Sequence, residues 1–234
     1  MLEELRQCGV CPFRCKVNRL EGKIGKCGCN DKIKIALASL HYYEEPCISG
    51  KNGSGTVFFS NCNLNCLFCQ NYKISQEGKG REVSIEELAD IFLNQQKNGA
   101  NNINLVTPTM YASNYFEIAT KAILEMINQV ETPEFNENGL IKKGVIIRHL
   151  VLPGHIQNSK HILKWLKENV NSRAYVSVMA QYFPTYKAKE DKYLNRKLTN
   201  KEYSEIEQYL YLLDIENGYM QDLGKHEEEY VPDF

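Results

Sequence analysis

Apolar residues recur along the chain at two different spacings, and the succession of these spacings predicts a mixed α/β protein. Four segments place apolar residues three and four positions apart, which is the pattern of a helix with one buried face. Shorter apolar, β-prone runs have the length of strands. The predicted helices cover residues 84–98, 113–129, 159–169 and 199–213, and the predicted strands cover residues 33–40, 54–60, 103–106, 145–152 and 174–181.

Polar residues and a glycine mark the ends of two predicted helices. Ser84 and Glu87 have the spacing of a capping box, and Thr199 and Glu202 repeat it. Gly99 follows the first of these helices, at a position where glycine commonly ends a helix because it tolerates positive φ.

Strand 54–60, helix 84–98 and strand 103–106 form a predicted βαβ unit, whose two strands are expected to be parallel. Ligands of such units gather at the carboxyl ends of the strands. The loop after residue 60 and the segment Thr107-Pro108-Thr109 both follow strands at this end. That segment offers hydroxyl and carbonyl groups to a ligand, and an ordinary turn is the alternative.

The loop after the second predicted strand carries Cys62, Cys66 and Cys69 at the spacing Cys-x3-Cys-x2-Cys. A cuboidal [4Fe–4S] cluster has four irons that each take a thiolate, so three cysteines leave one iron open. An open metal position is where substrate or cofactor chemistry occurs. Zinc is one alternative, although zinc cysteines usually come as paired Cys-x2–4-Cys knuckles. A disulfide framework is a weaker alternative, because nine cysteines is an odd number and no signal peptide is predicted.

Five of the nine cysteines lie within the first thirty residues. Four of them could gather around zinc or a second iron–sulfur cluster, because a short loop with little apolar content needs a metal to hold its structure. The alternative is a set of reduced thiols without a metal. The four predicted ligands are Cys8, Cys11, Cys15 and Cys27, Cys29 is the fifth cysteine, and Gly22, Gly25 and Gly28 would permit the tight turns.

Two groups of polar residues are weaker site candidates. His41, Glu44 and Glu45 follow the first predicted strand and could orient a substrate or the surroundings of the cluster, or serve a surface or hinge role. Arg148 and His149 interrupt an apolar strand, and neighbours on a strand point to opposite faces, so at most one faces a barrel interior. Arg148 suits a carboxylate or phosphate through its planar fork, and a simple salt bridge is equally compatible.

Composition and charge narrow the class of protein. The 234 residues include 43% apolar residues, which is normal for a globular protein with a sizeable core. No run of about 18 apolar residues occurs, so a soluble, cytoplasmic protein that does not insert into a membrane is expected. The net charge of −1 gives no electrostatic basis for binding nucleic acid or an anionic membrane.

The cysteine spacing, Phe68 directly before the last cysteine and the preceding strand resemble the signature of the radical S-adenosylmethionine (radical SAM) superfamily. The resemblance implies that Cys62, Cys66 and Cys69 ligate a [4Fe–4S] cluster whose open iron is chelated by SAM. It also implies that the reduced cluster cleaves SAM, and that the resulting 5′-deoxyadenosyl radical abstracts a hydrogen atom from a substrate.

The same resemblance assigns cofactor contacts to residues outside the cluster loop. Thr107, Pro108 and Thr109 are expected near the amino group of SAM, where many radical SAM enzymes have a Gly-Gly-Glu-Pro motif. Arg148 and His149 are further candidates for the cofactor pocket.

Segments along nearly the whole chain carry a more specific resemblance: residues 8–27, 41–50, 53–56, 69–71, 106–109 and 148–154. They are similar to the superfamily branch named after pyruvate formate-lyase activating enzymes. This resemblance implies an oxygen-sensitive oxidoreductase that works anaerobically with flavodoxin or ferredoxin as electron donor. It also implies a protein substrate that loses a hydrogen atom from a backbone glycine.

The chain departs from that branch in two ways. Met110 stands where the branch has histidine, and two further βα units are missing between strand 103–106 and helix 113–129. Each unit would take roughly 30 residues. The predicted fold is therefore α/β, a partial, shortened (β/α) barrel of about four parallel strands with a Cys-rich N-terminal extension. The expected domains are residues 1–50 (extension), 51–198 (core) and 199–234 (C-terminal helix and tail, polar from residue 217).

The leading functional prediction is thus a radical SAM enzyme. The shortened barrel leaves a catalytically impaired iron–sulfur remnant as one alternative. A zinc-stabilised binding module without redox chemistry is the other.

Overall fold

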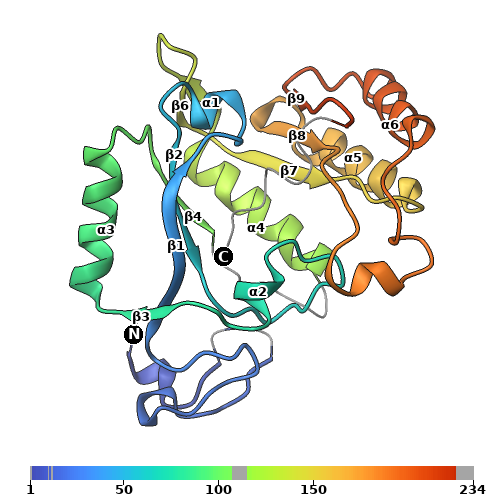
Figure 1. Ribbon diagram of the computed structural model, residues 1–234. Coiled ribbons are helices and arrows are strands. Elements are labelled where there is room, and N and C mark those ends of the chain that lie inside the picture. The colour runs from blue at the N-terminus through green and yellow to red at the C-terminus, as the bar shows by residue number, and fades with distance from the viewer. Residues whose placement is uncertain (1, 10, 12, 107–114, 225–234) are drawn as a thin grey trace. The chain divides into compact units, whose positions relative to one another are not determined.

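The computed structural model describes residues 2–9, 11, 13–106 and 115–224. The chain divides into two compact units, and the division falls near residue 119, within α4 (Tyr115–Val130). Each unit has its own main sheet (Figure 1).

The first unit is built on a four-stranded sheet in the order β3-β1-β2-β4. The central pair β1 and β2 is antiparallel, and so is the pair β1 and β3, whereas β2 and β4 are parallel. The parallel pair confirms the predicted βαβ unit. The strands of this sheet are β1 (Ile33–His41), β2 (Ser54–Phe59), β3 (Arg81–Val83) and β4 (Ile103–Val106).

One long helix, α3 (Ile85–Lys97), connects β3 to β4 and packs on the sheet. The Ser84 hydroxyl accepts a hydrogen bond from the Glu87 amide at its start, and Gly99, with a φ of 89°, follows its end. Leu88, Ile91 and Phe92 of its predicted apolar stripe pack against the core of this unit. The shorter helices of this unit are η1 (Leu2–Leu5), η2 (Arg19–Glu21), α1 (Pro46–Ser49) and α2 (Tyr72–Ser75).

The second unit contains a parallel sheet in the order β7-β8-β9 and a hairpin of β5 and β6 that turns near Gly139. The full capping box of Thr199 and Glu202 is present at the start of α6. The elements that follow α4 are β5 (Glu134–Phe135), β6 (Ile141–Lys143), β7 (Ile146–Leu150), α5 (Ile156–Asn169), η3 (Asn171–Arg173), β8 (Tyr175–Met179), η4 (Tyr186–Glu190), α6 (Asn200–Leu212) and β9 (Gly218–Met220).

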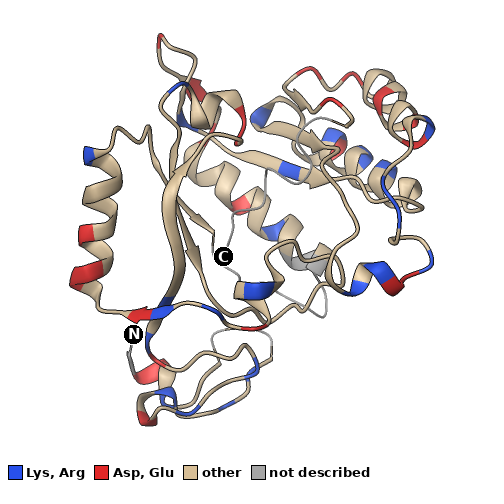
Figure 2. Ribbon diagram, in the orientation of Figure 1, with Lys and Arg blue, Asp and Glu red and all other residues tan. Residues whose placement is uncertain are grey.

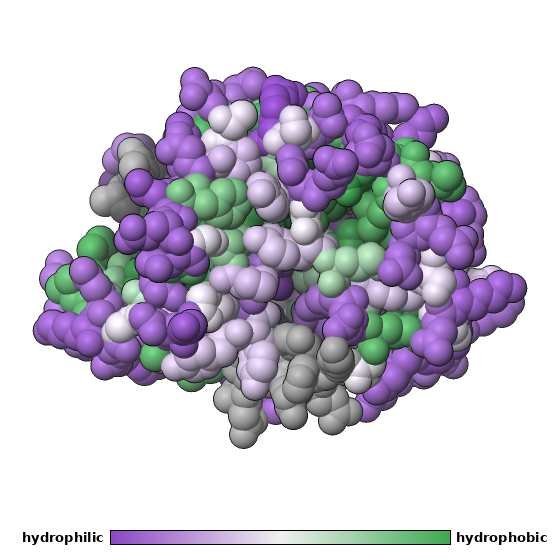
Figure 3. Space-filling model, turned by 90° about the horizontal axis from the view of Figure 1, so that it is seen from above, coloured by the Kyte–Doolittle hydropathy of each residue, from purple (hydrophilic) through white to green (hydrophobic). Residues whose placement is uncertain are grey.

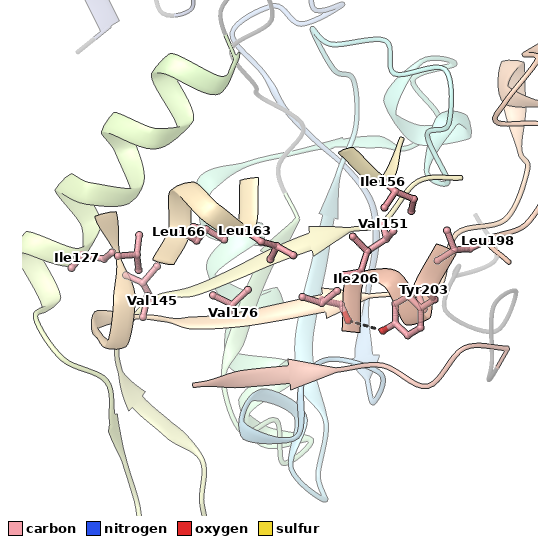
Figure 4. Packing of buried hydrophobic residues seen from close by; sticks show 14 residues of the cluster. Ile127, Val145, Val151, Ile156, Leu163, Leu166, Val176, Leu198, Tyr203 and Ile206 are labelled. Carbon is pink, nitrogen blue, oxygen red and sulfur yellow. Dashed lines mark hydrogen bonds between the residues drawn. The ribbon is translucent and has the colours of Figure 1, made fainter. Parts of the chain in front are cut away.

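The largest hydrophobic core lies in this second unit, where α5 and α6 pack on the parallel sheet (Figure 4). Leu163 and Leu166 of α5 and Ile206 of α6 are almost completely buried there. The Tyr203 hydroxyl donates hydrogen bonds to the carbonyls of Val178 and Gln221, so this polar group is satisfied inside the core.

Three predictions about the architecture need correction. The parallel strands expected in one partial barrel belong to two separate sheets. The apolar sequence of β4 predicts a buried strand, but Ile103 and Leu105 are 38% and 48% exposed, and β4 is an edge strand of its sheet. The region after residue 217 was expected to be an irregular tail, yet β9 pairs with β8 there through its backbone.

Acidic and basic residues are mixed along the helices and loops of both units (Figure 2). On the face shown in Figure 3, polar residues predominate and apolar residues form smaller patches between them. Within the described ranges, no helix has both the length and the apolar character that crossing a membrane requires.

Candidate metal centre

The loop with three cysteines leaves the sheet at the carboxyl end of β2. Because β4 runs parallel to β2, with Val106 opposite Phe58, both strands end on this side of the sheet. Asn61 and Asn65 have positive φ values of 70° and 55°, and asparagine tolerates this left-handed backbone better than most residues. The two asparagines therefore allow the tight turns on which the cysteines are presented.

Cys62, Cys66 and Cys69 form no disulfide and are all partly buried. Burial raises the pKa of the Cys66 thiol, and the charges of Cys69 and Cys62 raise it further. Burial also raises the pKa of Cys69, with Cys62 adding to the increase. Cys62 and Cys69 thus lie close enough to Cys66 for their negative charges to disfavour its thiolate form. A positively charged iron–sulfur cluster would remove this repulsion, so the three donors fit such a group.

Helix α2 supports the loop from its C-terminal side. The Asn61 amide donates to the Ile74 carbonyl at 2.8 Å, and both Ile74 and Ser75 are buried. The Ser75 hydroxyl lies 3.1 Å from the Cys69 sulfur, and this hydrogen bond lowers the pKa of that thiol against the effect of burial. The Leu64 amide donates to the Cys62 sulfur at 3.4 Å. These donors would stabilise negative charge on ligating sulfurs.

The geometry distinguishes a cluster from a single ion. Among the residues that the structure describes, no three His, Cys, Asp or Glu side chains are arranged to hold one metal ion. A single zinc ion needs all of its ligands within bonding distance of one centre. A cuboidal cluster presents a different iron to each cysteine, so its ligands stand farther apart. The three-cysteine loop therefore suits a cluster better than zinc.

The predicted second metal site at Cys8, Cys11, Cys15 and Cys27 is not supported. These residues belong to the described part of the chain, and they form no group suited to a single metal ion such as zinc. The buried Arg19 side chain instead contacts some of these thiols, with its Nη2 atom 3.4 Å from the Cys27 sulfur and 3.9 Å from the Cys15 sulfur.

The Arg19 guanidinium compensates the negative charge that these thiols can carry. Burial alone would lower its pKa, but hydrogen bonds to Cys8 and Cys27 raise the pKa above its usual range. The guanidinium also donates to the Cys29 carbonyl. Gly25 leaves room for it, because a Cβ atom there would overlap Arg19. A cation within the chain thus takes the place that was predicted for a metal.

Two other groups of predicted site residues have different outcomes. Thr107, Pro108 and Thr109 lie outside the described residues, so their role stays a prediction. For His41, Glu44 and Glu45, a role in the surroundings of the cluster was one alternative and a surface or hinge role the other, and the direction of β1 does not favour the first. His41 pairs with Ser54 at the start of β2, whereas the cysteine loop follows the end of that strand. Glu44 lies 3.5 Å from His41 Nδ1 and accepts a hydrogen bond from Asn104 of β4 at 3.1 Å.

Arg148 and His149 are adjacent residues of β7 in the second unit. The Arg148 side chain is exposed, and His149 is largely buried with an Nε2 atom that has no hydrogen-bond partner among the described residues. Burial lowers the pKa of His149 to about 4, so its imidazole is neutral at pH 7.

Comparison with known proteins identifies the family. The family model of the Radical SAM superfamily matches residues 56–217, which is more than half of the chain and includes the cysteine loop. The chain belongs to the radical SAM superfamily. Members of this superfamily typically use a [4Fe–4S] cluster and SAM, in agreement with the three-thiol site.

A relative of this radical SAM protein comes from Methanocaldococcus jannaschii and is named "Uncharacterized protein MJ0674". The two chains are 31% identical over 268 aligned positions, which cover 91% of this chain and 75% of the relative. Since 91% of 234 residues is about 213 residues, about 55 of the 268 aligned positions have no counterpart in this chain.

Three residues of the radical SAM protein with roles near its cysteines were not predicted from the sequence. They are Arg19 between the N-terminal thiols, Asn61 at the start of the cluster loop and Ser75 beside Cys69. Asparagine directly after a strand and before a cysteine was a usable signal for a left-handed turn. Arg19 and Ser75 gave no such signal, because their partners are set by tertiary packing.

Proposed function

We propose that this protein is a radical SAM enzyme in which Cys62, Cys66 and Cys69 hold a [4Fe–4S] cluster that SAM completes at its open iron. When bound, this cluster supplies the electron for reductive cleavage of SAM and hence for hydrogen abstraction from a substrate. The observation that carries the proposal is the gathering of three partly buried thiols on one loop at the carboxyl end of β2.

The chain's own residues would hold and tune the cluster. The three cysteines bind it, the Ser75 hydroxyl hydrogen-bonds the Cys69 sulfur, and the Leu64 amide does the same for Cys62. Hydrogen bonds to ligating sulfurs stabilise the more negative, reduced state. The buried residues of α2 beneath the loop limit access of water to Cys69.

We also propose that Thr107, Pro108 and Thr109 bind the amino group of SAM. The proposal is supported by the register of β4, because the chain leaves this strand on the same side of the sheet as the cluster loop. Arg148 and His149 remain alternative candidates for a contact of the cofactor pocket, because neighbours on a strand point to opposite faces. The permanent positive charge of Arg148 suits a carboxylate, whereas His149, neutral at pH 7, would act as a neutral hydrogen-bond partner.

The finer function that we propose is activation of a glycyl-radical enzyme in the cytoplasm, with flavodoxin or ferredoxin as electron donor. It is supported by the resemblance of residues 8–27, 53–56 and 148–154 to the branch named after pyruvate formate-lyase activating enzymes. In this proposal the hydrogen atom comes from a backbone glycine of a protein partner.

We further propose that the barrel is shortened by about two βα units after β4. Two observations support this. Strand β4 is the edge of its sheet and exposes Ile103 and Leu105, as expected if a neighbouring strand has been lost. The alignment with the relative from M. jannaschii also leaves about 55 positions without a counterpart, and two βα units take roughly 60 residues.

The decisive experiment is anaerobic reconstitution with iron and sulfide, followed by electron paramagnetic resonance of the reduced protein with and without SAM. We expect a reduced-cluster signal that changes when SAM is added, because SAM would bind the open iron. A cluster signal that SAM leaves unchanged would contradict the proposal and favour an iron–sulfur remnant. Absence of a cluster would favour a zinc-stabilised module.

A further inference from the structure

The segment Cys27-Gly28-Cys29 lies beside the cluster loop because of the antiparallel pairing of β1 and β2. The segment shortly precedes β1, whose first residues pair with the end of β2, with Ile35 opposite Phe59. The Ser60 amide donates to the Lys34 carbonyl at 2.9 Å and extends this pairing. The residues before β1 therefore emerge where the cluster loop begins.

Contacts of Asn61 confirm this proximity. A Cβ atom at Gly28 would lie 3.1 Å from the Asn61 side-chain oxygen, so this turn approaches Asn61 closely. The Cys29 thiol forms a hydrogen bond with the same side chain. Cys27, Cys29 and Cys62 line one cavity of about 230 Å³, which gives small molecules access to both thiols.

The two cysteines of this segment lie on one turn and line the same cavity. Gly28 has a φ of 80°, a left-handed conformation that turns the backbone between the two cysteines. The Cys29 thiol donates a hydrogen bond to the Cys27 carbonyl at 3.8 Å, and the Arg19 guanidinium lies 3.4 Å from the Cys27 sulfur. Neither cysteine is engaged in a disulfide. The pair thus has the proximity and the charged neighbour of a reactive dithiol.

The electrostatics assign different roles to the two sulfurs. The hydrogen bond from Cys29, together with Arg19, outweighs burial and lowers the pKa of Cys27 to about 5. The hydrogen bond to Cys27, burial and the Cys27 charge raise the pKa of Cys29 well above its usual range. The Arg19 guanidinium, 3.4 Å from the Cys27 sulfur, favours the thiolate at Cys27, which is the form in which a cysteine attacks, and leaves Cys29 as the resolving partner.

We propose that Cys27 and Cys29 form a reversible dithiol–disulfide site for hydroperoxides, with Cys27 as the attacking sulfur and Cys29 as the resolving thiol. The Cys27 thiolate attacks a peroxide oxygen, the O–O bond breaks, and the leaving hydroxide is protonated to water, while the Cys27 sulfur becomes a sulfenic acid. The Cys29 sulfur then attacks Cys27, the S–O bond breaks and a second water leaves.

The overall step balances, because one hydrogen peroxide and two thiols yield one disulfide and two waters. The two sulfurs lose two electrons in total and the peroxide gains them. A low-molecular-weight thiol restores the pair by thiol–disulfide exchange and is itself oxidised to its disulfide. The site goes beyond the proposed radical SAM function and does not depend on it.

The test uses the reconstituted full-length protein and one equivalent of hydrogen peroxide, followed by iodoacetamide in denaturant and trypsin digestion. Lys26 and Lys32 flank a peptide, residues 27–32, that contains Cys27 and Cys29 and no other cysteine. We expect this peptide to lack both alkyl groups and to be lighter by two hydrogens than the dithiol form. Treatment of the peroxide-oxidised protein with dithiothreitol before iodoacetamide is added should restore alkylation of both cysteines. Cys11, which is partly buried, serves as the internal reference and should stay alkylated at this dose.

Two variants separate the roles of the thiols. In Cys29→Ser, a sulfenic acid at Cys27 should accumulate and be labelled by dimedone, because its resolving thiol is missing. In Cys27→Ser, Cys29 should remain unlabelled. Recovery of the doubly alkylated peptide at a dose that oxidises Cys11 would overturn the proposal. Dimedone labelling of Cys29 in Cys27→Ser would also overturn it. A third contradicting result would be one zinc per chain in the wild-type protein that is lost in Cys27→Ser.

Discussion

The cluster loop and the N-terminal cysteines place the same side chain in opposite electrostatic environments. In the loop, Cys66 and Cys69 are partly buried near other sulfurs, and their pKa values are raised. At the N-terminus, the buried Arg19 lies among the thiols, and the pKa of Cys27 is lowered to about 5. The first site is stable as thiolates only if positive charge comes from a bound cluster, whereas the second carries its own cation.

This difference explains why cysteine count and spacing did not predict both sites correctly. Cysteine spacing indicates whether the sulfurs can come close together. The source of the compensating positive charge decides whether they bind a metal cluster or surround a cation of the chain itself. At the N-terminus, that counter-charge comes from an arginine four residues from the nearest predicted ligand, Cys15.

The largest effect is expected from Cys66→Ala. Without one of three ligands the cluster has too few thiolates, so iron, sulfide and visible absorbance should be lost almost completely after anaerobic reconstitution. Metal analysis and absorbance measure this. Cys29→Ser is the matched control, because it also removes a partly buried thiol. Equal iron retention in both variants would refute the assignment of the cluster to the loop.

The second effect concerns the cation at the N-terminal site. In the reduced wild-type protein, alkylation of Cys27 should rise with pH through about 5 and then level off, because the thiolate reacts and the thiol does not. Arg19→Met should move this midpoint toward the ordinary value of about 8.5 and slow alkylation at pH 6 on the order of tenfold.

Mass spectrometry of peptide 27–32 measures this rate. Arg14→Met is the control, because Arg14 is exposed and its loss changes the net charge equally. An unchanged midpoint in Arg19→Met, or the same change in both variants, would show that the guanidinium does not activate Cys27.

A smaller effect is expected from Ser75→Ala in the cluster loop. The Ser75 hydroxyl lies 3.1 Å from the Cys69 sulfur, and a donor to a ligating sulfur stabilises the reduced cluster. Removing it should make the reduction potential more negative without loss of iron. An anaerobic redox titration checks this, and Ser75→Thr, which keeps a hydroxyl, should retain more of the wild-type potential. A more positive potential in Ser75→Ala would contradict this role.

The smallest effect on either cysteine site is expected from Thr199→Ala in the second unit. Loss of the capping box at the start of α6 should lower the free energy of unfolding by about 1 kcal/mol. Urea denaturation followed by circular dichroism measures it. Iron content and Cys27 reactivity should stay unchanged. A change in either would mean that the two cysteine sites also depend on stability of the second unit.

Much of the fold could be predicted from local patterns. Apolar spacing gave the positions of α3, α5 and α6, and hydroxyl residues marked two of their starts, because caps act within one helical turn. Pairing of distant segments could not be predicted in the same way. Strands β4 and β7 belong to different sheets, and β9 joins the second of these sheets. Both features depend on tertiary contacts that no local pattern encodes.

In the candidate site, too, local features could be predicted and features that depend on tertiary packing could not. Cys62, Cys66 and Cys69 were predictable because all three ligands lie on one short loop. The choice between the two roles considered for His41, Glu44 and Glu45 depended on the direction of β1, which is antiparallel to β2 and so ends beside the start of β2, away from the cluster loop. The role of Arg19 depends on burial, which the sequence alone did not reveal.

The most direct test of the account is the content of iron, acid-labile sulfide and zinc per chain after anaerobic reconstitution, in the wild-type protein and in the combined variant Cys8→Ser, Cys15→Ser and Cys27→Ser. We predict about four irons and four sulfides per chain in both proteins, as a single [4Fe–4S] cluster requires, with no stoichiometric zinc. About eight irons in the wild type that fall to four in the variant, or one zinc that the variant loses, would contradict the account. Either result would show that the N-terminal thiols hold a metal and that Arg19 does not replace it.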